Sequence, residues 1–204
     1  LKLPDDLITR ADLGFSQDDF VITYAGTLGL AQGVGVLLDA ADRFKDDSKT
    51  KFLIIGEGVE KQALIGRANT IGLDSVTFLP LQPKHRMPSF LRISDAAFVS
   101  LKSDILTDSV PSKLYEYLGV GCPVILAANG DSCDLIRKAD AGVVIEPGNV
   151  QQLVEAIRSL SLNESLKREC SKNGREYVRQ HYLRSDLAKQ LEKICLSITA
   201  TSQK

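Results

Sequence analysis

The sequence predicts a doubly wound, Rossmann-like α/β domain with a parallel sheet of about six strands and helices on both faces. Two observations lead to this fold class. Short apolar runs rich in β-branched and aromatic residues are continuous, which is typical of strands buried on both faces of a parallel sheet. Segments with helical periodicity separate these runs, and such alternation predicts right-handed crossovers.

The apolar runs predict strands at residues 20–25, 51–55, 75–79, 96–101, 123–127 and 142–145. The periodic segments predict helices at residues 33–44, 59–71, 84–93, 111–120, 131–139, 150–160, 163–181 and 185–198. In the first of these helices, Val36, Leu37, Ala40 and Phe44 recur at helical spacing. Glycines gather where strands lead into helices, at the sheet edge where ligands of such folds bind.

Composition excludes several kinds of protein. The 204 residues carry 25 basic and 26 acidic side chains, a net charge of −1, and no basic run that would favour nucleic acid. No apolar run is long enough to span a bilayer, and no signal peptide is evident. The four cysteines form no CxxC pair, which favours a reduced, cytoplasmic setting.

The most informative stretch is residues 102–125, KSDILTDSVPSKLYEYLGVGCPVI. Pro111 suits the first turn of a helix, with Ser109 or Val110 as its cap. A helix start attracts anions because its amides are unpaired and its dipole is positive there. The amides expected to face an anion are those of Ser112, Lys113 and Leu114, with the Lys113 side chain beside them.

Three further residues of this stretch extend the expected site. Glu116 lies one turn after Ser112 on the same helix face, where it could accept both hydroxyls of a ribose. Lys102 directly follows a predicted strand and could pair with a diphosphate from the other side. Asp108 would be repelled by that anion unless it faced a sugar hydroxyl or a developing cation. Each could instead be an ordinary surface residue.

These motifs resemble the carboxyl-terminal half of GT-B fold glycosyltransferases of group 1, or family 4. That family has a carboxylate, seven residues, Glu and then G-x-P-V-I; here the order is Asp108, SVPSKLY, Glu116 and YLGVGCPVI. The Pro-Ser-Lys version resembles a subgroup that includes bacterial polysaccharide and aminosugar transferases. The likeness covers nearly the whole chain, from the linker-like LPDDL to Pro147-Gly148.

The resemblance implies a role for each matching residue. Glu116 would bind the donor ribose, and Asp108 and Lys102 would act at the transferred sugar and its diphosphate. The donor-binding residues implied are Gly26, Thr27, Leu79, Leu81, Lys102, Ser112, Lys113, Leu114 and Glu116, with residues 79–83 contacting the base through their backbone. Two departures stand out. Thr27 and Gln32 occupy a loop that often carries Arg and Lys, and Asp108 replaces the usual Glu.

The implied protein is a retaining hexosyltransferase of polysaccharide biosynthesis. Residues 1–204 would be its donor-binding domain, inactive without an amino-terminal acceptor domain, and the LKLPDD start suggests a fragment. Its expected partners are a nucleoside diphosphate sugar and a glycan or lipid acceptor, at the inner face of the membrane through the missing half. No cofactor or metal is expected, because the amides and lysines stabilise the leaving phosphate and no Asp-x-Asp motif occurs.

Other functions remain open from the residues alone. A nucleotide-sugar epimerase would also hold UDP at a helix start but needs acid–base residues that are not evident. A dinucleotide oxidoreductase is disfavoured because Gly26, Gly29 and Gly33 do not form G-x-G-x-x-G. A non-catalytic nucleotide-binding or interaction module is compatible with the composition.

Overall fold

The computed structural model describes residues 7–101 and 110–201, with side chains as far as residue 196. Its described part contains a six-stranded parallel sheet in the order β3-β2-β1-β4-β5-β6. This confirms the predicted fold class and number of strands. The strands are β1 (Phe20–Ala25), β2 (Thr50–Ile55), β3 (Val76–Leu79), β4 (Ala96–Ser100), β5 (Val124–Ala127) and β6 (Gly142–Ile145).

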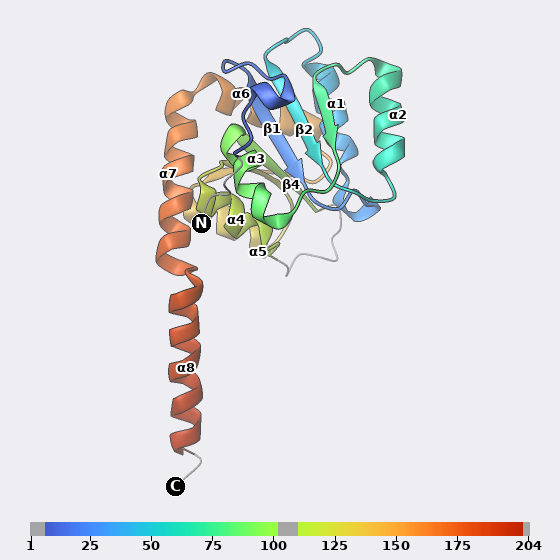
Figure 1. The fold of residues 1–204 in the computed structure, drawn as a ribbon. Helices are drawn as coiled ribbons and strands as arrows, with labels where there is room; N and C mark the ends of the chain where they lie inside the picture. Colours follow the sequence, from blue (N-terminus) through green and yellow to red (C-terminus); the bar gives the residue numbers. More distant parts are fainter. Residues whose placement is uncertain (1–6, 102–109, 202–204) are drawn as a thin grey trace.

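Helices cover both faces of this sheet (Figure 1). One face is covered by α1 (Gly35–Arg43), α2 (Lys61–Ile71) and α6 (Val150–Leu162). The other is covered by α3 (Met87–Ile93), α4 (Lys113–Val120) and α5 (Asp131–Ala139), with α7 (Glu164–His181) packed on α4. Three short 3-10 turns are also described: η1 (Ala11–Leu13), η2 (Leu30–Gln32) and η3 (Lys84–Arg86).

The core forms because the central strands bury both of their faces. In β1, Ile22 and Tyr24 pack into the cluster beneath α1, whereas Val21 and Ala25 point to the opposite face and pack with Phe90 of α3. A strand with apolar residues at every position is stable only between two helical layers. The continuous apolar run FVITYA is therefore consistent with the position of β1 in the middle of the sheet.

Several helices begin later than the sequence predicted, and two of them, α1 and α4, lie at the switch point. Helix α1 starts at Gly35 because the preceding residues form the η2 turn. Helix α4 starts at Lys113 rather than Pro111, and the Leu114 amide donates to the Pro111 carbonyl at 3.0 Å in a tighter first turn. Leu114 thus lacks the unpaired amide predicted for anion binding, because the chain itself supplies its acceptor.

The strand order creates a switch point between β1 and β4. From β1 the chain builds outward through β2 and β3 on one side, and from β4 through β5 and β6 on the other. The connection after β1 leads to α1 on one face of the sheet, whereas α4 lies on the other. Such divergence leaves a crevice at the carboxyl ends of these strands, where ligands bind in open α/β sheets.

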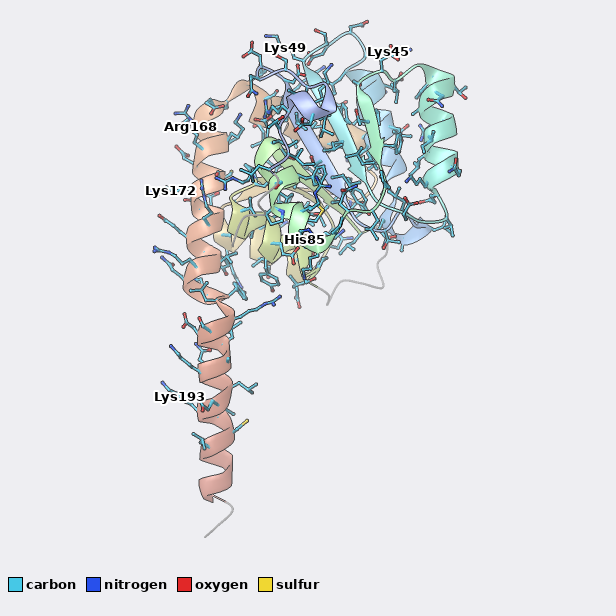
Figure 2. All side chains as sticks on the ribbon, in the orientation of Figure 1. Lys45, Lys49, His85, Arg168, Lys172 and Lys193 are labelled. Carbon is cyan, nitrogen blue, oxygen red and sulfur yellow. The ribbon has the colours of Figure 1, made fainter. Side chains whose placement is uncertain are left out.

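The last helix, α8 (Arg184–Thr201), extends away from the sheet (Figure 1). Leu187, Leu191 and Ile194 lie on one side of it at helical spacing and are largely exposed. Figure 2 shows Lys172 of α7 and Lys193 of α8 projecting away from the sheet. The pattern of α8 is that of an amphipathic helix whose apolar side is exposed.

Candidate nucleotide-binding site

Two side chains of α4 lie against the carboxyl end of β1. The Lys113 ammonium and the Tyr117 hydroxyl each donate to the Ala25 carbonyl oxygen, both at 3.0 Å. They sit one turn apart on α4, so the first turn of the helix is held directly over the switch point. Burial raises the pKa of Tyr117, which keeps its hydroxyl a donor.

Lys113 is held in place rather than moving freely in solvent. Its ammonium lies 5.2 Å from the centre of the Tyr24 ring, a distance typical of a cation–π contact. Burial lowers the pKa of Lys113, because a desolvated ammonium loses hydration. A half-buried cation at a helix start is well suited to an incoming anion, which would supply a countercharge.

Glycines at the ends of β1 and β2 allow the chain segments at the ends of β1, β2 and β3 to pack closely beneath Lys113. The Gly26 amide donates to the Ile55 carbonyl, and the Gly56 amide donates to the Leu79 carbonyl. A Cβ atom at Gly26 would lie 2.5 Å from the Lys113 ammonium, and one at Gly56 would overlap the Gly26 carbonyl oxygen. The ends of β1, β2 and β3 are therefore joined by contacts that admit no side chain at these positions.

Glu116 points from α4 toward the segment that follows β3. Its carboxylate forms an ion pair with the Lys84 ammonium of η3 at 2.9 Å, and about a third of the Glu116 side chain is exposed. Glu116, the residue predicted to bind the ribose, is thus neither fully buried nor fully exposed to solvent. It faces the same segment, residues 79–84, whose first part was predicted to contact the base.

The remaining predicted residues fall into three groups. Thr27, Leu81 and Ser112 are exposed along this edge, and the Thr27 carbonyl accepts a hydrogen bond from Tyr24 at 2.6 Å. Leu79 is half-buried at the end of β3. Lys102 and Asp108 lie outside the described residues.

Sequence reasoning missed two residues of this site, Tyr117 and Lys84. Tyr117 follows Lys113 by four residues, so helical spacing could have placed both on one face. Nothing local links Lys84 to Glu116, since 32 positions separate them in the chain. An open pocket of about 260 Å³ lies at the same edge, lined in part by Gly33, Ser100 and Gly148.

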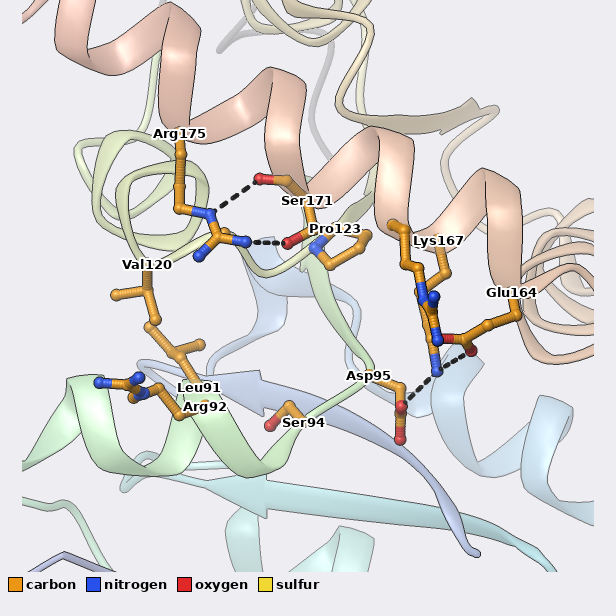
Figure 3. Close-up of a pocket in the computed structure, with 12 residues that line it drawn as sticks. Leu91, Arg92, Ser94, Asp95, Val120, Pro123, Glu164, Lys167, Ser171 and Arg175 are labelled. Carbon is orange, nitrogen blue, oxygen red and sulfur yellow. Dashed lines mark hydrogen bonds and ion pairs between the residues drawn. The ribbon is translucent and has the colours of Figure 1, made fainter.

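A second pocket lies at the opposite edge of the sheet, where β4 and β5 begin (Figure 3). Asp95 accepts hydrogen bonds from Arg10 at 2.7 Å, from the Val21 amide at 2.9 Å and from Lys167 at 2.8 Å. Lys167 also pairs with Glu164 of α7. These bonds join the amino-terminal segment, β1 and α7, so we assign this pocket a structural role.

The fold and this edge define the class of protein: a doubly wound α/β domain with a half-buried lysine and a half-buried glutamate at its switch point. The chain belongs to the family of glycosyl transferases group 1, whose sequence profile matches residues 5–177. The resemblance inferred from the motifs is therefore confirmed.

Individual relatives support the same assignment. The chain is 32% identical over 158 residues to WcaI of Escherichia coli (strain K12), assigned as a colanic acid biosynthesis glycosyl transferase. That match covers 75% of this chain and 38% of WcaI. The chain is 28% identical over 181 residues to the lipopolysaccharide core biosynthesis glycosyltransferase LpsD of Rhizobium meliloti (strain 1021), covering 88% of this chain and 50% of LpsD.

Solved structures show the same architecture. Sucrose-phosphate synthase from Thermosynechococcus elongatus superposes with a TM-score of 0.81 at 21% identity, over 94% of this chain and 48% of that one. Anabaena HepE, solved with UDP and glucose, gives 0.81 at 19% identity, over 92% of this chain and 50% of that one. At such identities the likeness shows the fold alone.

The chain spans half or less of the length of these relatives. It matches the carboxyl-terminal halves of the GT-B glycosyltransferases among them. Within the described residues, no helix is long and apolar enough to cross a membrane.

Proposed function

We propose that residues 1–204 form the donor-binding domain of a retaining glycosyltransferase. The domain binds a nucleoside diphosphate sugar, and the whole enzyme transfers the sugar to a glycan or lipid-linked acceptor in polysaccharide biosynthesis. The observation that carries this proposal is the position of the first turn of α4, with Lys113 at the switch point and Glu116 one turn along. The enzymes named above, from colanic acid and lipopolysaccharide synthesis, are consistent with it.

The chemistry follows from where charge develops. When the bond between the anomeric carbon and the diphosphate breaks, the electron pair stays on the phosphate oxygen and the sugar becomes cation-like. The Lys113 ammonium, which is fixed and partly desolvated, and the amides of Ser112 and Lys113 are proposed to stabilise that negative charge. Outside the described residues, Asp108 is proposed to act at the transferred sugar and Lys102 at its diphosphate. No metal or cofactor is part of this proposal.

The first prediction concerns Glu116. Glu116→Ala is expected to weaken UDP binding by about 1.5–3 kcal/mol, the range for hydrogen bonds to a charged group. Lys84→Ala serves as the matched control, because it breaks the same ion pair from the exposed side. Such a pair is worth at most about 1 kcal/mol, so the control should change affinity much less. Calorimetric titration measures both, and equal affinities in wild type and Glu116→Ala would refute the ribose assignment.

Titration of the wild-type domain with UDP, GDP, ADP and NAD separates the possible functions. Binding of one nucleoside diphosphate supports a nucleotide-sugar enzyme, either the proposed transferase or the epimerase, whereas binding of NAD alone supports an oxidoreductase. The absence of binding for all four nucleotides supports a non-catalytic module. The domain alone is expected to bind donor but to transfer nothing, because the acceptor site is proposed to lie in another domain. Full turnover by residues 1–204 would contradict that division of labour.

The exposed apolar side of α8 supports the expectation of a second domain. Leu187, Leu191 and Ile194 form a stripe that water would otherwise cover. The relatives contain at least as much additional chain as this one matches. We therefore propose that the amino-terminal half of the whole enzyme contacts this side of α8.

A second prediction concerns pH. The pKa of Lys113 is lowered by burial from its usual 10.5, and a bound diphosphate requires the protonated form. UDP affinity should therefore fall as pH rises toward 10.5 in the alkaline range. The free energy of unfolding should instead rise with pH over this alkaline range. The reason is that the unfolded state still holds the Lys113 proton at pH values where the folded state has begun to lose it.

The control for this prediction is Lys113→Met, which removes the titrating group. The ratio of wild-type to Lys113→Met affinity, measured by calorimetry at each pH, cancels ionisation of the uracil base. We expect this ratio to fall toward one as pH rises. A ratio that stays constant over the alkaline range would show that the Lys113 charge does not contribute to binding.

A further inference from the structure

An aromatic pocket lies on the other side of α4 from the ion pair of Glu116. It has a volume of about 160 Å³ and opens between α4, α5 and α7. The side chains that give it its chemistry are Tyr115, Tyr177, Tyr182, Asp131, Asp134 and Lys138. None of these residues is used by the proposed donor site.

Three half-buried tyrosines form one wall of this pocket. The ring centres of Tyr115 and Tyr182 are 4.5 Å apart, and those of Tyr177 and Tyr182 are 5.9 Å apart. Burial raises the pKa of Tyr115 and that of Tyr177, with the neighbouring Tyr182 adding to the effect. This wall therefore combines apolar ring surface with hydroxyl groups that stay protonated and can donate.

One face of α5 forms the opposite wall. Asp131, Asp134 and Lys138 recur there at helical spacing. Asp134 has a loose ion pair with Arg137 at 3.7 Å, and about 60% of both side chains is exposed. Acidic residues suit the first turn of a helix, which by itself would explain the two aspartates. It does not explain why they face a tyrosine wall.

We propose that this pocket binds the ring of a neutral saccharide. The C–H surface of the ring would pack on the tyrosines, and its hydroxyls would donate to the Asp131 and Asp134 carboxylates. Other ligands fit less well. A phosphate would be repelled by two carboxylates, a metal cation by Lys138, and a wholly apolar ligand would leave the charged groups desolvated without a partner.

The size and position of the pocket suggest its role. Its volume equals about five waters of bulk liquid, enough for little more than a single ring. Tyr115 and Glu116 are consecutive on α4, so their side chains point in different directions around the helix axis. The saccharide and the donor ribose would therefore bind at neighbouring faces of α4. If the proposed transferase function holds, the pocket binds a sugar unit of the acceptor glycan other than the one that reacts. Saccharide binding itself does not depend on that function.

The test uses methyl α-glucoside, methyl α-galactoside and methyl α-mannoside as probes, with saturation-transfer NMR on the wild-type domain. At least one probe is expected to show saturable binding in the millimolar range, both with and without UDP. Asp131→Asn and Asp134→Asn should each weaken that binding by about tenfold, as expected for a hydrogen bond to a charged group. Asp74→Asn, at an exposed position after α2, is the matched control and should bind like wild type.

Two results would overturn the proposal: no saturable binding of any of the three probes to the wild type, or unchanged binding in both aspartate variants. The two substitutions change exposed positions, so neither depends on disturbing the core. The outcome is also independent of the donor site, because UDP titration can succeed while the glycoside titration fails, and the reverse.

Discussion

Gly56→Ala is expected to destabilise the domain by about 3 kcal/mol, the upper end of the typical range for overpacking. The added methyl group would overlap the carbonyl oxygen of Gly26, which belongs to the backbone and cannot rotate away as a side chain can. Relief requires moving the end of β1 or that of β2, which are paired in register through Ala25 and Ile55. Urea unfolding, with an unchanged slope, measures the loss.

The same substitution should also reduce UDP binding. Gly26 lies directly beneath the Lys113 ammonium, so a shift of its carbonyl displaces the cation at the switch point. Gly66→Ala is the matched control, because Gly66 is in the middle of α2 and a Cβ there meets nothing within 4 Å. The control should stabilise the domain by about 0.5–1 kcal/mol, since alanine favours helix more than glycine does. A similar loss in both variants would contradict the steric explanation.

Asp95→Ala is expected to cost about 3 kcal/mol, at the lower end of the range for removing one partner of a buried ion pair. The Asp95 side chain is 11% exposed and accepts bonds from two cations and a backbone amide. Its removal leaves Arg10 without this carboxylate and the Val21 amide without its acceptor. Lys167 loses one of its two carboxylates and keeps Glu164, so the connection between α7 and the sheet is weakened as well.

The control for Asp95→Ala is a substitution in an exposed ion pair that shares Glu164 with Lys167. Arg168→Ala removes an ion pair with Glu164 in which the side chains are 78% and 57% exposed. Exposed pairs contribute little, so the change should stay within about 0.5 kcal/mol. Urea midpoints measure both variants. Equal destabilisation by the two substitutions would show that burial does not determine the value of these pairs.

Most of the fold could be predicted from local patterns. A continuous apolar run such as FVITYA is stable only when covered on both faces, so it predicts a buried strand without knowledge of its neighbours. The runs that became β3 and β6 instead form the two edges of the sheet. Helices α5 and α6 begin where their periodicity begins, at Asp131 and Val150. Among the helix starts that the sequence missed, those at Gly35 and Lys113 follow turns whose hydrogen bonds leave little trace in residue type.

The sequence by itself determined the fold class, the family and the helix that carries Lys113 and Glu116, because periodicity and motif spacing are properties of neighbouring residues. Only the tertiary structure decided that the Lys113 ammonium donates a hydrogen bond to the Ala25 carbonyl and that Glu116 forms an ion pair with Lys84. The same holds for the three tyrosines that meet between α4 and α7. Such contacts join segments dozens of residues apart, and they depend on how the strands are ordered in the sheet, which the spacing of residues along one helix does not encode.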